Sequence, residues 1–577
     1  MVRSAVEQSQ STQAPIIVPP TQPSEAPADH QVRGNYVDNS VFVGLLLGGT
    51  SQQGSESILP PVGASKPQNL RIPTNHGITV TDVFGPPVDS LNISCDTYSN
   101  LWELYKKNFD PLVKILHIPT IHPVLLEASL SPGEADDTTM ALLCAVCFAA
   151  VSTATKADVL HQSLHTKSSM LRHFMQEMDG RFMRAQLILR PNTLTLTAFV
   201  IYLTALRTHD ATRTVWILIG LAKRIAESLG LHEDGARLRL SPFDIEMRRR
   251  LWWHLTALEA TAPENHGFNT SFIAGDQQFP LPSNINDEDI RPRMTEHATK
   301  NEMWTETSFS IMNLDLCRRL RSAVATNSPG GFNVQMNMIE ETEQVMSQQL
   351  LRFADMEKLI CRAADALLRI SILKAQFILK LQRWLSTGVG SGSQYSDLPQ
   401  SIFTTAIKLL EDGYLLQSGN LFPNFAWFYQ QHPQLYALFL VLRTLHASPV
   451  RAESDRAWLA VDNYFTCLAD FEEAAEMKGR TSCVWAVLNP LRDKARESSS
   501  KMGHTTQGPT SSTYTDLESI QSVSPHPDPA PSIPAFESGV HLPFTRANQP
   551  SLEYPAFDDV LSWQDFTDWF NMDIGNF

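Results

Sequence analysis

Cysteine is scarce in this chain, and none stands before Cys95. A zinc-held DNA-binding module needs C-x2-C pairs repeated over a short stretch, with basic residues between them. Only Cys144 and Cys147 have pair spacing, and they lie in the apolar run 140–148 (MALLCAVCF). We therefore interpret both as small buried core residues and predict no metal site. The seven cysteines follow no secretory signal, so reduced thiols inside a cell are expected.

Positive charge is also in short supply, because 46 Lys and Arg face 61 Asp and Glu and the net charge is −15. Lys and Arg contacts to phosphates supply most non-specific affinity for nucleic acids. An acidic chain without a long basic tract is therefore a poor DNA binder by itself. The longest early apolar run, residues 41–47 (VFVGLLL), is far shorter than the ~20 residues of a membrane span. No membrane contact is expected.

Catalytic motifs are missing as well. The sequence contains no nucleophile elbow, no H-E-x-x-H and no phosphate-binding loop. The glycine run at 388–392 departs from the dinucleotide fingerprint and follows a predicted helix instead of a strand. His232, His254 and His266 lie near acidic residues, but no nucleophile accompanies them. We predict that the chain is not an enzyme and uses no cofactor.

What the sequence does contain is helical periodicity between residues 99 and 492. No strand-like alternation of useful length interrupts it, so the predicted fold is all-α, an irregular multi-helix bundle. Residues 1–98, rich in Ser, Gln, Pro and Gly, predict a mostly disordered region, and a disordered tail is expected at the other end. Residues 101–120 predict an amphipathic helix, a proline break and a second short helix that ends before Pro119. Further helices are predicted at 140–154, 168–178, 194–207, 339–364, 365–385, 402–416, 457–477 and 482–494. The pair at 339–385 has no breaker and is compatible with one long helix.

Two further helices and a loop occupy residues 210–290. The first has an apolar face that includes Val215 and Ile219, and it stops at Gly230. Ser241 is the expected N-cap of the second, and residues 279–290 (FPLPSNINDEDI) predict a turn-rich loop. The arginines at 248–250 could serve DNA contact or nuclear import. We favour ion pairs of one or two of them with Glu246 or the acids of the loop, the rest being solvated.

Several short sequence motifs, taken in their order along the chain, resemble the middle homology region of fungal zinc-cluster transcription factors. They are SLGLH at 228–232, LSPFDIEMRRRLWWHL at 240–255, ENHG at 264–267 and FPLPSNINDEDI at 279–290. The match extends to NFDPLVKILHIPT at 108–120, TETSFSIMNLDLCRRL at 305–320 and FAWFYQQHPQLYAL at 425–438. In the last of these, Pro433 stands where a helix former is expected. The resemblance covers residues 99–492 and implies a regulatory domain of a nuclear transcription factor that controls a pathway gene set, such as one of secondary metabolism.

The end of the chain differs from the helical part in composition. Residues 493–550 predict a Ser/Thr/Pro-rich linker, and residues 551–577 hold six acids, many aromatics and no Lys or Arg. Acidic–aromatic alternation is typical of disordered activation segments, because the acids keep the rings from collapsing and leave them available to a partner groove. The predicted partner-binding residues are Phe557, Trp563, Asp565, Phe566, Asp568, Trp569 and Phe570.

These observations predict a fungal transcription regulator whose tail binds the transcription machinery or a co-activator. DNA would be reached through a partner, or through a zinc module missing from this version of the chain. A homodimer and a heterodimer both stay open. Two other functions also stay open, a co-regulator that senses a small molecule and an enzyme that reuses the helical core.

Overall fold

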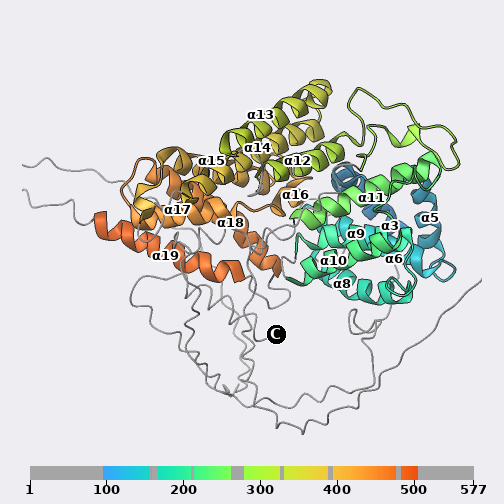
Figure 1. Ribbon diagram of the computed structural model, residues 1–577. Helices are drawn as coiled ribbons and strands as arrows, with labels where there is room; N and C mark the ends of the chain where they lie inside the picture. Colours follow the sequence, from blue (N-terminus) through green and yellow to red (C-terminus); the bar gives the residue numbers. More distant parts are fainter. Residues whose placement is uncertain are drawn as a thin grey trace, which may run out of the picture. The chain divides into compact units, whose positions relative to one another are not determined.

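The computed structural model describes residues 95–155, 158, 167–209, 213–261, 279–324, 331–386, 394–475 and 483–503. Every regular element in these ranges is a helix, which confirms the predicted all-α fold (Figure 1). No helix within these ranges has both the length and the apolar composition that a membrane crossing requires.

The first group of helices surrounds α6 (Asp137–Thr153). Because α6 is apolar on all sides, it is buried on all sides, and every residue from 139 to 153 is buried. Asp136 caps it by accepting hydrogen bonds from the backbone N–H groups of Thr138 and Thr139 at 2.9 and 3.0 Å. Packed around or beside it are α3 (Cys95–Leu104), the π-helical turn η1 (Tyr105–Phe109), α4 (Asp110–Val113), α5 (Ile118–Leu130), α8 (Lys167–Arg184) and α9 (Thr193–Leu206). The predicted proline break in the first helix is a π-helical turn that continues into α4, because Pro111 occupies a first-turn position of α4.

The central pair consists of α10 (Arg213–Ser228) and α11 (Pro242–Thr261). The stop predicted after α10 is confirmed, since Gly230 has a φ of +69° and Leu231 N–H donates to the Ala226 carbonyl at 3.0 Å. Ser241 accepts from the Asp244 N–H at 3.1 Å, which confirms the predicted N-cap of α11. The predicted loop follows from residue 279, with one 3-10 turn, η4 (Asp287–Asp289).

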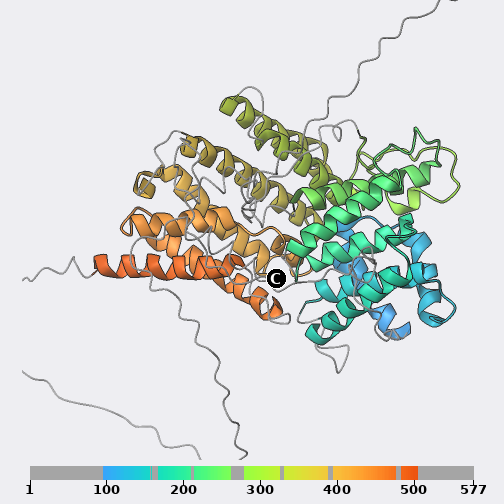
Figure 2. The same cartoon turned by 60° about the horizontal axis from the view of Figure 1, so that its bottom comes forward.

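Three helices that lie side by side come next, α12 (Ser308–Val324), α13 (Gly331–Gln349) and α14 (Leu359–Ser386) (Figure 2). The prediction of a boundary at 364/365, or of one long helix, is wrong. The chain leaves α13 through the short turn η5 (Leu351–Phe353) and starts again at Leu359. Asp355 accepts from the N–H of Glu357 at 3.1 Å, so a side chain competes with the helical hydrogen bond here without any Gly or Pro.

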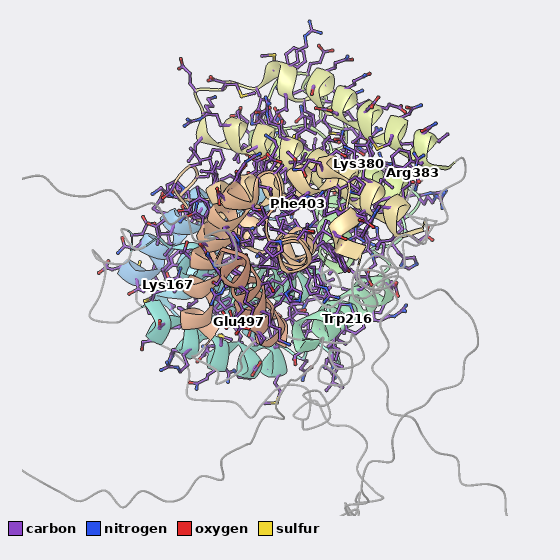
Figure 3. The ribbon with its side chains drawn as sticks, turned by 90° about the vertical axis from the view of Figure 1, so that its left-hand side faces the viewer. Lys167, Trp216, Lys380, Arg383, Phe403 and Glu497 are labelled. Carbon is purple, nitrogen blue, oxygen red and sulfur yellow. The ribbon has the colours of Figure 1, made fainter. Side chains whose placement is uncertain are left out.

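The last group contains η6 (Gln394–Asp397), α15 (Gln400–Gln417), α16 (Ala426–Gln430), α17 (Leu435–Ala447), α18 (Ser454–Ala475) and α19 (Cys483–Gly503). Phe403 of α15 is fully buried among the side chains that fill the space between these helices (Figure 3). Pro433 separates α16 from α17, so the helix predicted to be doubtful there is indeed interrupted. α19 continues through residues 493–503, which the sequence predicts to be linker.

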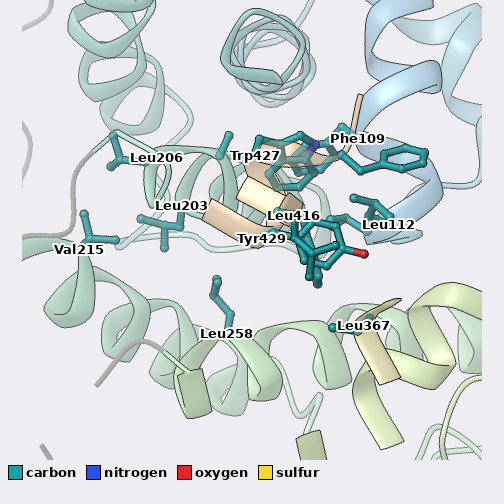
Figure 4. Packing of buried hydrophobic residues seen from close by; sticks show 14 of the residues in the cluster. Phe109, Leu112, Leu203, Leu206, Val215, Leu258, Leu367, Leu416, Trp427 and Tyr429 are labelled. Carbon is teal, nitrogen blue, oxygen red and sulfur yellow. The ribbon is translucent and has the colours of Figure 1, made fainter. Parts of the chain in front are cut away.

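The five-residue helix α16 joins this last group to the earlier ones (Figure 4). The indole N–H of Trp427 donates to the Asn108 carbonyl at 3.0 Å, and its ring stacks on Phe109 at 5.1 Å. The Tyr429 hydroxyl donates to the Ala363 carbonyl at 2.7 Å. One apolar core therefore contains side chains from both sides of residue 386.

Several sequence predictions lie outside the described residues. They are most of the 1–98 region, the ENHG motif at 264–267, the glycine run at 388–392, residues 504–550 of the linker and the whole 551–577 segment. The predicted partner-binding residues of that segment are among them, namely Phe557, Trp563, Asp565, Phe566, Asp568, Trp569 and Phe570.

Candidate functional site: a buried ion cluster that joins four sequence motifs

Four of the sequence motifs meet in one buried cluster of charges. The motif at 108–120 contributes Asp110 and Lys114, and the motif at 240–255 contributes Glu246 and Arg250. The loop motif at 279–290 contributes Asp287, and the motif at 305–320 contributes Glu306. We call these six side chains the ion cluster. All of them except Glu306 are buried.

Lys114 lies directly after α4 and is the cation on one side of the cluster. Its Nζ lies 2.8 Å from Asp110 Oδ2, 2.9 Å from Asp287 Oδ2 and 3.4 Å from Glu306 Oε2. The ammonium group has three N–H donors, and each of these carboxylates offers an acceptor to them. Its side chain is only 3% exposed, so the carboxylates replace the water that a surface lysine would bind.

Arg250 is the cation on the other side. Its Nη1 donates to Asp287 Oδ1 at 2.9 Å and its Nε to Glu246 Oε1 at 3.1 Å. The Glu246 carboxylate also accepts from the backbone N–H of Ser283 at 3.1 and 3.2 Å. These contacts confirm the predicted ion pairing of an arginine with Glu246 and with an acid of the loop.

The other two arginines of the run are also held within the protein. Arg249 binds Asp234 through both ends of the carboxylate, with Nη2 2.9 and 2.8 Å from the two oxygens. Arg248 Nη2 donates to the Leu229 and Gly230 carbonyls, where the carbonyls that end α10 lack helical partners. The expectation that the remaining arginines are solvated is therefore wrong, because both are partly buried and bonded.

Asp287 is the centre of the cluster, since it touches both cations and the backbone of a distant segment. Its Oδ2 accepts from the Ile118 N–H at 2.9 Å, and its own carbonyl lies 2.9 Å from His117 Nε2. The Asp287 N–H donates to Glu306 Oε2 at 3.1 Å. These bonds attach the 279–307 loop to the start of α5 and to the residues before α12.

Electrostatics differ between the two carboxylates that share Lys114. Burial raises the pKa of Asp110, and the favourable charge of Lys114 only partly offsets this. Burial also acts to raise the pKa of Asp287, but Lys114 and Arg250 outweigh it and hold that pKa below its usual range. Two buried cations face three buried carboxylates, and at Asp110 burial outweighs the neighbouring cation, so its charged form is disfavoured.

The arrangement is suited to hold a conformation more than to carry out chemistry. The charged groups bind one another and the backbone, and Glu306 alone has a half-exposed side chain, at 53%. Within the ranges that the structure describes, no three His, Cys, Asp or Glu side chains gather in a way that could hold a metal ion. Cys144 and Cys147 are fully buried as predicted, and burial raises the pKa of the Cys144 thiol to about 12.

Asp110, Lys114, His117 and Glu306 were missed as site residues by the sequence reasoning, although their motifs were recognised. The spacing of Asp110 and Lys114 was an available signal, because an i, i+4 pair of opposite charge on a helix is a local ion pair. Their contact with Asp287 had no such signal. Ile118 and Asp287 are 169 residues apart, and only the fold brings them together.

Comparisons with known proteins agree with the motifs. Residues 102–384 match the family described as "Fungal specific transcription factor domain". The chain is 26% identical over 405 residues to Transcriptional regulator AacuB of Aspergillus aculeatus, covering 67% of this chain and 54% of that protein. It is 23% identical over 377 residues to an aurofusarin cluster transcription factor of Gibberella zeae, covering 63% of this chain and 55% of that one.

A third relative is C6 finger domain transcription factor nscR of Aspergillus fumigatus, 26% identical over 411 residues, which are 68% of this chain and 52% of the relative. This chain thus spans about half the length of the curated relatives it matches. All three carry the names of transcription regulators, not of enzymes. The matched region contains the whole ion cluster. Through residues 102–384, this chain belongs to the fungal-specific transcription factor domain family.

Proposed function

We propose that this protein is a nuclear transcription regulator of a fungal pathway gene set. The observation that carries the proposal is the family match over residues 102–384, joined to relatives whose names are those of pathway-cluster transcription factors. One of these relatives is named for the aurofusarin cluster, so a gene set of secondary metabolism is the expected target class.

In this proposal the helical domain is the scaffold and the acidic–aromatic segment 551–577 is the output. The four rings of Trp563, Phe566, Trp569 and Phe570 are spaced three, three and one residues apart, so they would form one apolar face if the segment became helical on a partner. DNA would be reached through a partner protein or through a C6 finger module like that named in a relative. By either route to DNA, the proposed role of segment 551–577 is the same, namely to bind a partner and activate transcription.

The function is tested by deleting the gene and measuring all transcripts under conditions that induce secondary metabolism. We expect coordinated loss of a contiguous set of pathway transcripts and their return when the gene is restored. A transcriptome unchanged by the deletion would refute a regulatory role.

The tail is tested separately, by fusing residues 551–577 to a foreign DNA-binding module and measuring a reporter. Replacing Trp563, Phe566, Trp569 and Phe570 by Ala should abolish activation. A matched control replaces Ser511, Ser512, Thr513 and Thr515 by Ala in a fusion of residues 504–577, and it should keep full activity. Equal activation by the tail with and without its rings rejects the tail as the output.

A second candidate function, small-molecule sensing, is favoured by a hollow of about 250 Å³ between α12 and α13. It is lined by Arg318, Arg319, Ser322, Met338, Glu341 and Thr342. Arg318 and Arg319 both pair with Asp315, and a small carboxylate is the ligand that their remaining N–H groups and the neighbouring hydroxyls would suit. Citrate and benzoate are suitable probes, and saturable thermal stabilisation of the protein that Arg319→Met removes would support sensing. No stabilisation by any carboxylate would count against it.

A further inference from the structure

α17 and α19 lie side by side, and a histidine of one contacts a serine of the other (Figure 1). His446 is in the last turn of α17, and its Nδ1 lies 2.9 Å from Ser498 Oγ. The same hydroxyl donates to the Lys494 carbonyl of its own helix at 3.1 Å. Ser498 is partly buried and therefore presents a hydroxyl of α19 to a second helix.

The charges that act on this contact are positive. On α19, Lys494 precedes Ser498 by four residues and Lys501 follows it by three, so both are its neighbours on the helix surface. On α17, Arg443 precedes His446 by three residues. Burial, and then the charges of these three cations, lower the pKa of His446, although a hydrogen bond with the Lys494 backbone acts in the opposite direction. Basic groups from two helices therefore lie around Ser498.

The acids of this region do not balance those charges. Asp493 lies 3.6 Å from Arg492, and Asp462 of α18 pairs with Arg496. Glu497 is exposed and supplies one negative charge against the three positive charges described above. An anionic group attached to the hydroxyl would thus enter a site of net positive charge, where charge-assisted hydrogen bonds are strong.

Ser498 is the first of three consecutive serines, and only this one has a contact with α17 among the bonds described for the three. Ser499 and Ser500 each donate to a carbonyl of their own helix, at 3.1 and 3.0 Å. Ser500 is two residues beyond Ser498, so the two side chains are on opposite faces of α19. The surroundings of Ser498 are therefore specific to one of three serines in the same sequence.

The sequence and the position of Ser498 also suit a protein kinase. Lys494 and Arg496 precede it, and kinases select their substrates in part by such charge patterns. α19 ends at Gly503, and the end of a helix opens at a low cost in free energy. An enzyme can therefore reach the hydroxyl without unfolding the core.

We propose that Ser498 is a phosphorylation site whose phosphate binds His446, Lys494 and Lys501. A protein kinase transfers the γ-phosphoryl group of ATP to Oγ, the hydroxyl proton leaves and ADP is released. The phosphate adds about two negative charges and three acceptor oxygens, which fasten the end of α19 to the end of α17. This inference does not depend on the proposed function.

The helix dipole opposes a phosphate at this position, because Ser498 is near the C-terminal end of α19. The dipole is equivalent to about half a negative charge and acts mainly within the last turn. The cluster offers three full positive charges and the imidazole of His446. The ion pairs therefore outweigh the dipole, and phosphorylation stabilises the contact between α17 and α19.

The contact is tested by placing phosphoserine at position 498 of the full chain and measuring amide hydrogen exchange by mass spectrometry. Exchange in the last turns of α19 should become about ten-fold slower, because the added bonds must break before these turns open. Phosphoserine at position 500 is the matched control, with the same charge on the opposite face, and it should give no slowing. His446→Gln should remove part of the slowing at 498.

Equal exchange with and without the phosphate at 498, or equal slowing by phosphate at 500, overturns the proposal. Equal slowing of the unmodified chain by inorganic phosphate assigns the cluster to a free anion and also overturns it. The modification itself is tested on the full chain isolated from the cells that make it. Phosphate mapped to Ser498, and lost in Ser498→Ala, supports the proposal. Absence of that phosphate during growth, starvation and induction of secondary metabolism overturns it.

Discussion

Replacing Arg250 by Met tests whether the ion cluster holds the domain together. The side chain of Arg250 is 2% exposed, and its partners Glu246 and Asp287 are each 5% exposed. Met preserves most of the apolar stem but removes both charge-assisted hydrogen bonds. Glu246 then loses its cation and Asp287 loses one of its two, while both carboxylates stay buried.

The expected loss follows from that burial. Removing one partner from a buried ion pair destabilises proteins by about 3–5 kcal/mol. Lys114 still neutralises Asp287 in the variant, since its Nζ lies 2.9 Å from Oδ2. Glu246 keeps only the Ser283 N–H. We therefore expect the unfolding free energy to fall by about 3 kcal/mol, at the lower end of the range.

The measurement is urea denaturation of the full chain, with unfolding monitored by far-UV circular dichroism. Arg224→Met is the matched control, because Arg224 also pairs with a Glu but its side chain is 81% exposed. The control should change stability by less than about 0.5 kcal/mol. A loss for Arg250→Met no larger than that of Arg224→Met would refute the reasoning that the ion cluster is a structural anchor. A variant with Glu246→Gln added to Arg250→Met should recover part of the loss, because the uncompensated charge is removed.

Three further predictions concern acid stability and packing. Burial and the charge of Arg207 lower the pKa of His254 to about 4. The contribution of His254 to the free energy of unfolding is therefore complete above pH 6.5 and is lost as the pH falls from 6.5 towards 4. His254→Gln should flatten the stability profile in that window, and an unchanged profile would contradict the assignment. The pKa of Asp287 is lowered, so its contribution to the free energy of unfolding is lost only as the pH falls below 3.8. Asp287→Asn should lower stability at neutral pH and should remove the loss of stability that Asp287 causes below pH 3.8. Trp427→Ala should lower the free energy of unfolding by about 3–5 kcal/mol, because it opens a cavity between α16 and η1. A change below about 1 kcal/mol, measured by calorimetry, would show that α16 is not a central packing element.

The position of α16 bears on how much of the chain the domain needs. The family match ends at residue 384, yet Trp427, Phe428 and Tyr429 contact elements before that point. Aromatic side chains bury large areas, and these three leave less than 10% of their surface exposed. A protein cut after Ser386 would expose their partners, so the helices from α15 onward are part of the same core.

The sequence by itself determined the helical fold, the central helix pair with its caps and the pairing of one arginine of the run 248–250 with Glu246. These features depend on residues within a few positions of one another, such as an apolar face that repeats every 3.6 residues or an i, i+4 ion pair. The break between α13 and α14 escaped prediction because no Gly or Pro marks it, and the local bonds found there, such as that from the Glu357 N–H to Asp355, are made by residues that also occur inside helices. Only the tertiary structure decided that Lys114 meets Asp287, that His117 meets the loop and that α16 fills the core beside Phe109. Those contacts join segments far apart in the chain, and a side chain shows its charge or size in the sequence but not which distant neighbour the folding of the backbone will place beside it.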